Sequence, residues 1–66
     1  MGVLKVIEVL SSSKEGWEDA TAKAVKHASK SVKNIRSAYV NEQSAVVKNN
    51  EIEEYRVNVK ITFEVD

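Results

Sequence analysis

Cysteine and proline are absent from this 66-residue chain, and glycine occurs only twice. The lack of cysteine excludes a disulfide framework and a thiolate metal site. No glycine- or proline-rich stretch marks a linker, so we expect one domain over residues 1–66. Long apolar runs are also missing, which predicts no membrane-spanning helix. Lys5 and Glu8 interrupt Val3–Leu10, so we expect no secretory signal there and a cytoplasmic protein.

Charge of one sign is not in excess, because ten Lys and Arg balance ten Asp and Glu. This balance disfavours a dedicated nucleic-acid binder. Lys23, Lys26, Lys30 and Lys33 recur along one side of a predicted helix. A solvated outer face explains them better than contacts with phosphates, and weak polyanion binding at low salt is the alternative, because an oligomer would repeat the stripe in every copy.

Groups that carry catalysis or bind metals are scarce. His27 is the single histidine, and the sequence offers it no orienting partner. Glu51, Glu53 and Glu54 lie near a predicted turn, but they do not form the oxygen-rich loop that Ca²⁺ needs. We therefore predict no enzyme and no metal site.

A domain this small buries only about 60% of its unfolded surface, which predicts that copies of the chain associate.

The first half of the chain predicts a strand followed by a helix. Val3–Leu10 is rich in β-branched residues and is typical of a strand. Ser12 and Glu15 fit a capping box, with Ser13 as an alternative cap, for a helix over about Lys14–Lys33. Its apolar positions follow a helical period: Trp17, Thr21, Ala24, Val25, Ala28 and Val32. Asn34 is the expected C-cap.

The second half predicts a long hairpin. Ile35–Val47 suits an extended strand, and Lys48–Glu51 supplies a turn in which asparagine tolerates positive φ. Residues 55–65 alternate apolar and polar side chains, which predicts a strand of about 11 residues. The predicted fold is therefore α+β, in the order β-α-β-β, with an antiparallel sheet on one helix.

One face of this sheet is left without a helix. We expect Ala38 and Val40 to point toward the helix. The residues expected on the other face are polar or aromatic: Ser37, Tyr39, Asn41 and Gln43, beside Arg56, Asn58 and Lys60. This face suits another subunit or a flat polar ligand, and such long edge strands also favour a homo-oligomer.

Four segments together resemble the dodecin family: KVIEVL at Lys5–Leu10, the helical stretch Gly16–Arg36, VNEQSAVV at Val40–Val47 and EYRVNVKITFEV at Glu54–Val65. The resemblance covers nearly the whole chain. It implies a three-stranded antiparallel sheet wrapped on one helix, with twelve copies in a hollow shell. It also implies storage or buffering of flavins (FMN, riboflavin or FAD), held in pairs at subunit interfaces and stacked on a tryptophan.

The stacking tryptophan is missing, because Ser37 stands in its place after Arg36. Serine cannot stack, and Tyr39, two residues along, is a weaker substitute for the ring. By the resemblance, Arg56 meets the ligand's polar edge, and Glu42 and Gln43 bond it or bridge to the neighbouring subunit. The pattern is closer to the tryptophan-less members described as calcium dodecins.

We therefore expect a non-enzymatic homododecamer that binds a small planar or phosphate-bearing ligand of the flavin type. The expected cofactor-binding residues are those of the second strand and one arginine of the third: Arg36, Ser37, Tyr39, Glu42, Gln43 and Arg56. The alternative is a flavin-free assembly that binds calcium or other ions, or that acts as a scaffold.

Overall fold

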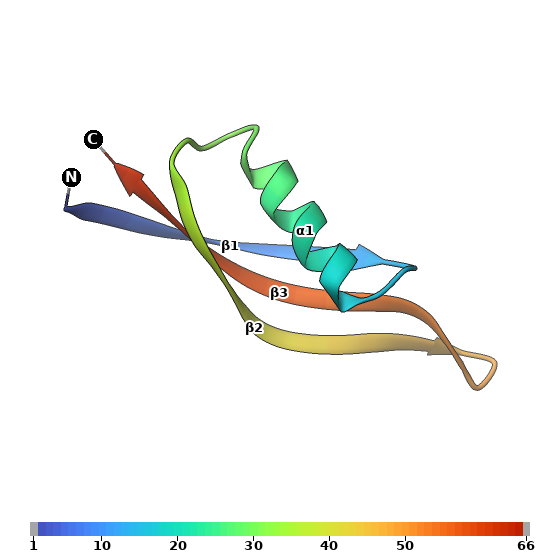
Figure 1. The fold of residues 1–66 in the computed structure, drawn as a ribbon. Coiled ribbons are helices and arrows are strands. Elements are labelled where there is room, and N and C mark those ends of the chain that lie inside the picture. The colour runs from blue at the N-terminus through green and yellow to red at the C-terminus, as the bar shows by residue number, and fades with distance from the viewer. Residues whose placement is uncertain (1, 66) are drawn as a thin grey trace.

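The computed structural model describes residues 2–65 and contains three strands and one helix. In chain order these are β1 (Val3–Ser13), α1 (Trp17–Ala28), β2 (Ile35–Lys48) and β3 (Glu51–Val65). The sheet order is β1-β3-β2, and both pairs are antiparallel. The strands curve around the helix, which crosses one face of the sheet (Figure 1). The predicted α+β fold and its β-α-β-β order are confirmed.

The core lies between α1 and the central strand β3. Three alanines spaced four residues apart on α1 are nearly inaccessible: Ala20, Ala24 and Ala28. They pack against Val57, Val59 and Ile61, which confirms the alternation predicted for this strand. Small helix side chains allow the helix to lie close to the branched side chains of the sheet. The core is narrow, in keeping with a molecule of 49 × 19 × 14 Å.

The helix begins later than predicted, and the capping-box prediction is wrong. Residues 11–13 continue β1, with Ser13 paired opposite Tyr55. The first helical residue is Trp17, preceded by Gly16 at φ +153°, a conformation that glycine adopts readily. No side chain of the described residues caps the N-terminal end of the helix. Ser13 instead accepts a hydrogen bond from the Glu15 amide at 2.9 Å.

The helix also ends earlier than predicted. Its last residue is Ala28, and the amides of Ser31 and Val32 donate to the Ala28 carbonyl in the turn that follows. Asn34 is therefore not the C-cap. It lies directly before β2 at φ +62°, and its carbonyl accepts a hydrogen bond from the Glu64 amide at 2.9 Å. It starts the hairpin rather than ending the helix.

The β2–β3 hairpin is longer than predicted but turns where expected. β3 has 15 residues, because pairing continues to Lys48 opposite Glu51. Asn49 and Asn50 form the connection with φ of 54° and 65°. Two successive residues with positive φ match the twist of antiparallel strands in a two-residue hairpin turn. The predicted turn is confirmed.

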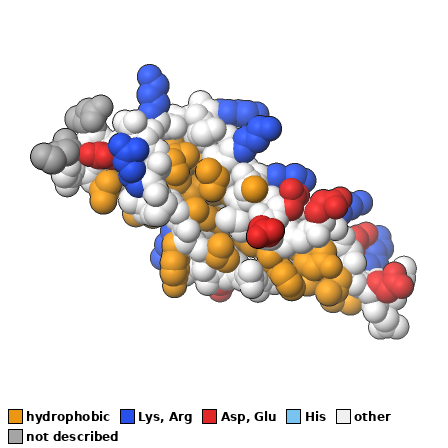
Figure 2. All heavy atoms as spheres, in the orientation of Figure 1, with side chains coloured by type: hydrophobic (Ala, Val, Ile, Leu, Met, Phe, Trp, Pro, Cys, Tyr) orange, Lys and Arg blue, Asp and Glu red, His pale blue; other side chains and the backbone are white. Residues whose placement is uncertain are grey.

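Side chains of different kinds gather on different parts of the surface (Figure 2). Basic side chains lie along the upper edge, over α1 and the loop after it, while hydrophobic ones lie below, toward β2 and the hairpin. Among residues 2–65, the single helix is too short and too polar to cross a membrane.

Candidate functional site

The candidate site lies on the outer face of the sheet, which we define as the face turned away from α1. Residues paired across antiparallel strands point to the same face. Arg56 and Asn58 of β3 lie opposite Ser12 and Leu10 of β1, on the face opposite the buried Val57. The even-numbered positions of β3 therefore build this face.

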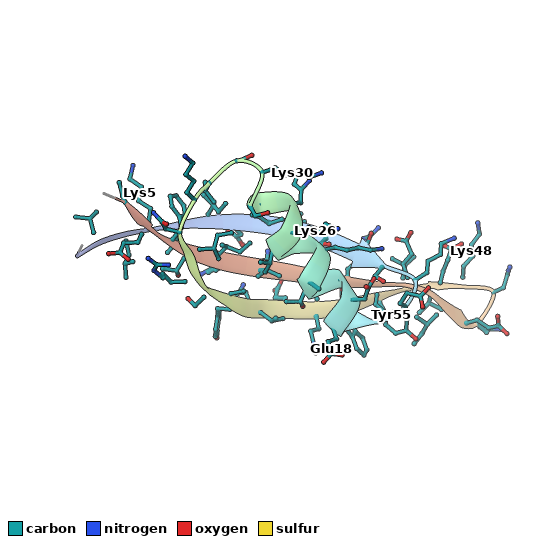
Figure 3. All side chains as sticks on the ribbon, turned by 45° about the horizontal axis from the view of Figure 1, so that its top comes forward. Lys5, Glu18, Lys26, Lys30, Lys48 and Tyr55 are labelled. Atoms are coloured by element: carbon teal, nitrogen blue, oxygen red, sulfur yellow. The ribbon has the colours of Figure 1, made fainter. Side chains whose placement is uncertain are left out.

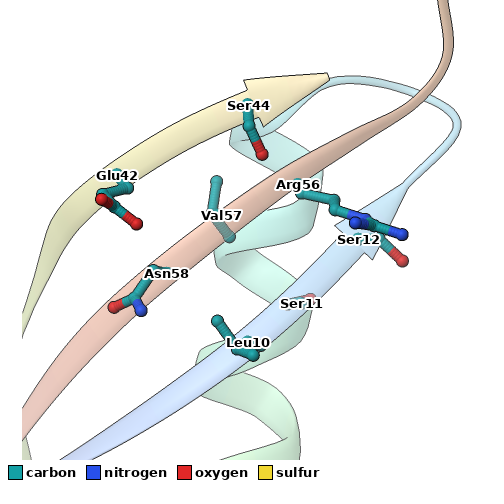
Figure 4. A pocket seen from close by; sticks show the side chains of 8 residues that line it. All are labelled: Leu10, Ser11, Ser12, Glu42, Ser44, Arg56, Val57 and Asn58. Carbon is teal, nitrogen blue, oxygen red and sulfur yellow. The ribbon is translucent and has the colours of Figure 1, made fainter. Parts of the chain in front are cut away.

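A pocket of about 430 Å³ opens on the outer face (Figure 4). All three strands contribute to its lining: Leu10, Ser11, Ser12, Glu42, Ser44, Arg56, Val57 and Asn58. The Arg56 side chain extends along the sheet toward Ser12, and Glu42 and Asn58 lie on the opposite side (Figure 4). A guanidinium, a carboxylate, an amide and hydroxyls thus surround a partly apolar floor. Such a lining suits a small polar organic molecule.

A β-bulge determines which β2 residues reach the pocket. The pairing register shifts between Val40 and Glu42, so that Asn41 has no partner on β3. After the shift Glu42 lies opposite Asn58, and Gln43 lies opposite Val57, on the helix side. The predicted orientation of Gln43 toward the outer face is therefore wrong. An extra residue reverses the facing of every later side chain in the strand.

Only two of the six predicted binding residues, Glu42 and Arg56, line this pocket. Ser37 and Tyr39 share the outer face, opposite Thr62 and Lys60, but they lie farther along the sheet. Tyr39 is 65% exposed and has a free ring face to offer.

Arg36 lies outside the pocket and is held by an acidic partner. Its Nε donates a hydrogen bond to Glu64 Oε1 at 3.0 Å, and its Nη2 lies 3.0 Å from the same oxygen in an ion pair. The predicted ligand contact of Arg36 therefore competes with an ion pair within the chain.

Several pocket residues were not among the predicted binding residues, although Asn58 was expected on this face: Leu10, Ser11, Ser12, Ser44 and Asn58. The serines of β1 were assigned to a helix cap. The signal that could have placed them in the sheet is the length of the third strand, which has room to pair with eleven residues of β1. Ser44 needed knowledge of the bulge.

Asn58 carries an unusual polar atom. Its Oδ1 is buried and has no hydrogen-bond partner among the described residues. Leaving a buried acceptor unpaired costs about 1–3 kcal/mol, and such atoms are normally satisfied by a ligand, a water or another chain. The Asn58 amide oxygen therefore offers an acceptor to a donor from outside the chain.

Trp17 binds the backbone of β2 from the helix side of the sheet. It packs against the core, as predicted, and its Nε1 donates to the Ser44 carbonyl at 2.8 Å. Its ring meets Tyr55 edge-on, with centroids 4.9 Å apart. Figure 3 shows Tyr55 beside the first turn of α1. Trp17 thereby fixes the backbone of a pocket residue without entering the pocket.

Acidic groups do not gather as metal ligands do. Among residues 2–65, no three His, Cys, Asp or Glu side chains form a group able to hold a metal ion. Asp19 is instead part of a structural contact, accepting a hydrogen bond from Ser13 Oγ at 2.6 Å and lying 3.3 Å from Lys23 Nζ. The Ser13 hydrogen bond, followed by Lys23, lowers the pKa of Asp19.

Comparison with known proteins places this architecture in a family. The sequence matches the dodecin family over residues 3–66. It is 38% identical to calcium dodecin of Mycobacterium tuberculosis over 65 residues, 98% of this chain and 92% of that protein. A crystal structure of that calcium-chelating dodecin, with its calcium-binding site, matches with a TM-score of 0.83, covering 98% of this chain and 93% of that one.

Other dodecin structures match even more closely in backbone shape. A mutant dodecin of T. thermophilus gives a TM-score of 0.91 at 26% identity, covering 97% of this chain and 96% of that one. The dodecin of Streptomyces davaonensis, 23% identical, gives the same TM-score over 97% and 94% of the two chains and shows the shared fold alone. The family match and the 38% identical relative together show that this chain belongs to the dodecin family.

Proposed function

We propose that this chain is a non-enzymatic binding protein that assembles into a closed shell of twelve copies. We further propose that its outer-face pocket takes a small planar ligand of the flavin type. The observation that carries the ligand proposal is the pocket lining, in which Arg56, Glu42 and Asn58 surround a partly apolar floor. Membership of the dodecin family supports both parts.

Assembly is supported by apolar side chains that one chain leaves in water. Leu4, Val6 and Leu10 lie on the outer face of β1 and are 57%, 58% and 78% exposed, with Glu8 between Val6 and Leu10 on the same face. Burying one such side chain contributes about 1.5–3 kcal/mol. A second copy laid over β1 would gain this free energy and would also wall in the pocket at Leu10.

The pocket offers complementary groups to a ring with carbonyl and N–H groups along one edge. Arg56 donates to carbonyl or phosphate oxygens, and the Glu42 carboxylate accepts from an N–H. A donor on the ligand would also satisfy the Asn58 amide, whose Oδ1 lacks a partner among residues 2–65. Ser37 supplies no stacking surface, so we expect weak binding. A ring stack is worth about 1–3 kcal/mol per base in nucleic-acid complexes.

The test is a fluorescence-quenching titration of riboflavin and FMN with the assembled protein. Ser37 lies farther along the outer face than the pocket, so Ser37→Trp should tighten binding about tenfold or more if the bound ring extends along that face to the new indole. Ser31→Trp, which adds the same ring to the loop before β2, should change nothing. Arg56→Ala should weaken binding about tenfold, whereas Lys60→Ala on the same face should not. Absence of quenching by both the parent chain and Ser37→Trp would refute the flavin proposal.

Calcium is the second candidate ligand, favoured by the 38% identical calcium dodecin. The described residues of one chain hold no acidic cluster, so a site here would need carboxylates from several copies around a symmetry axis. The same samples answer this question. A rise in melting temperature with Ca²⁺ that Mg²⁺ does not reproduce would support calcium, and equal effects of the two ions would reject it.

A further inference from the structure

The net charge of zero hides a segregation of charge along the chain. From Ala20 to Asn41 there is no acidic residue, and this stretch contains half of the ten Lys and Arg residues. The acidic residues lie in other parts of the sequence. Three of them, Glu51, Glu53 and Glu54, belong to the start of β3. In Figure 1 that hairpin lies at the end of the molecule away from the loop after α1.

The structure separates the basic residues that have partners from those that do not. Lys23 pairs with Asp19 and Arg36 pairs with Glu64. Lys26, Lys30 and Lys33 are exposed, and none of them forms an ion pair with another residue of the described range 2–65. We call these three residues the lysine surface. Figure 3 shows Lys26 and Lys30 extending from the end of α1 and the turn after it.

Stabilisation of the helix end does not account for the whole lysine surface. Cations favour the negative C-terminal end of a helix, but the effect falls off within the last turn. Lys26 lies in that turn, whereas Lys33 lies five residues beyond Ala28, the last helical residue. The loop therefore carries positive charge that the helix does not require.

We propose that the lysine surface binds a chain of phosphate groups. Lysine meets phosphate as a compact point charge and needs no fixed geometry, so exposed lysines in an acid-free segment suit a repeated phosphate better than one shaped ligand. Among the three lysines and the residues between them there is no Phe, Tyr or Trp to stack on bases, and the imidazole of His27 is the single ring in this stretch. Recognition is therefore sequence-independent, with a nucleic-acid backbone and inorganic polyphosphate as two sources of the same chemistry.

Self-assembly would strengthen this binding, and to that extent the inference rests on the proposed shell. Each copy repeats the lysine surface, so a long anion that bridges two copies meets the second one at a high effective concentration. For one copy, three phosphate contacts give a slope of about −2 for log affinity against log salt. Affinity should then fall about 20-fold between 50 and 200 mM salt, and more steeply where several copies bind.

The experiment measures fluorescence anisotropy of a labelled thirty-nucleotide oligo-dT with the assembled protein at 50 mM salt. The triple variant K26Q/K30Q/K33Q should lose about tenfold or more in affinity, together with most of the salt dependence. The matched control K5Q/K14Q/K48Q removes the same charge from exposed lysines elsewhere. In Figure 3, Lys5 and Lys48 lie toward opposite ends of the molecule, away from α1. The control should stay within about twofold of the parent.

Each outcome decides the proposal. Equal losses in the two triple variants would show that overall charge alone is responsible, and no binding by the parent chain would also overturn it. Displacement of oligo-dT by inorganic polyphosphate is expected, and the tighter of the two anions identifies the better source. Failure of polyphosphate to displace would show that bases are recognised, which contradicts the proposal. Arg56→Ala should retain oligo-dT binding, so the result does not depend on the flavin pocket.

Discussion

The two faces of the sheet differ in composition and in burial. On the helix side Val59 and Ile61 are fully buried, whereas on the outer face Val6 is 58% exposed. β1 carries apolar side chains on both faces, the pattern of a strand that is covered on both sides. β3 carries them only toward α1. The outer face therefore carries apolar side chains at Leu4, Val6 and Leu10 of β1, where another copy can pack, and is polar along β3, where a ligand can bind.

The largest effect on stability should come from a substitution in the core on the helix side of the sheet. Ile61→Ala removes a fully buried side chain from the centre of the core. The lost burial and the cavity left behind should lower the free energy of unfolding by about 2–5 kcal/mol. Urea denaturation at fixed protein concentration measures this change.

Lys60→Ala is the matched control, because it changes the exposed residue next to Ile61 in the chain. It should alter the free energy of unfolding by no more than about 0.5 kcal/mol. Similar losses in the two variants would mean that the helix side is not the source of stability, and the contrast between the faces would fail.

A charge introduced on the outer face should disrupt assembly without unfolding the chain. Val6→Asp places a carboxylate next to Leu4 on the outer face of β1. A second copy could cover this position only by burying that charge. We expect the mass from light scattering to fall from about 90 kDa, twelve times the 7.4 kDa chain, toward that of single chains or small oligomers. The dissociated chains should retain helix and sheet by circular dichroism.

Ser31→Asp adds the same charge to the loop before β2 and should leave the mass unchanged. If Val6→Asp keeps the mass of the twelve-copy assembly, the outer face of β1 is not a subunit contact. A parent chain that is itself monomeric at micromolar concentration would contradict the proposed shell directly.

The helix side was largely predictable from sequence because each of its signals is local. The alternation in β3 and the adjacent Asn49 and Asn50 act through one strand and one turn. Ala20 was missed because the predicted stripe passed through Thr21 instead, although the small size of Ala20 is what allows close packing of α1 on β3. Ser11 to Ser13 were misassigned because the same residues favour a helix cap and tolerate a strand.

The outer face was less predictable because it depends on the partner strand. Ideal alternation through β2 places Gln43 with Arg56, but the bulge at Asn41 exchanges Gln43 for Glu42 and Ser44. No residue in this stretch is a glycine that would mark a bulge. The shift is a property of the β2–β3 pair, and the sequence of one strand does not show it. The pocket lining could therefore be predicted only in part.

The smallest expected effect tests a polar contact at the edge of the helix side. Asp19 accepts a hydrogen bond from the buried Ser13, and its pKa is lowered by that bond and by Lys23. A carboxyl group with a lowered pKa in the folded state stabilises the fold above its unfolded pKa of about 3.9. This contribution is lost as the pH falls below about 4, through the lower folded value.

Asp19→Asn should therefore be less stable than the parent at pH 7, and the difference should shrink as the pH drops below about 4. Thermal melts at fixed protein concentration between pH 2.5 and 7 measure it. Glu18→Gln removes a carboxylate from the same first turn and serves as the control for the helix dipole, which favours both acids. Two results would mean that the Ser13–Asp19 contact does not stabilise the packing of β1 with α1. One is a stability difference between Asp19→Asn and the parent that stays constant with pH, and the other is an equal difference for Glu18→Gln. The stability of the helix side would then come from apolar packing alone.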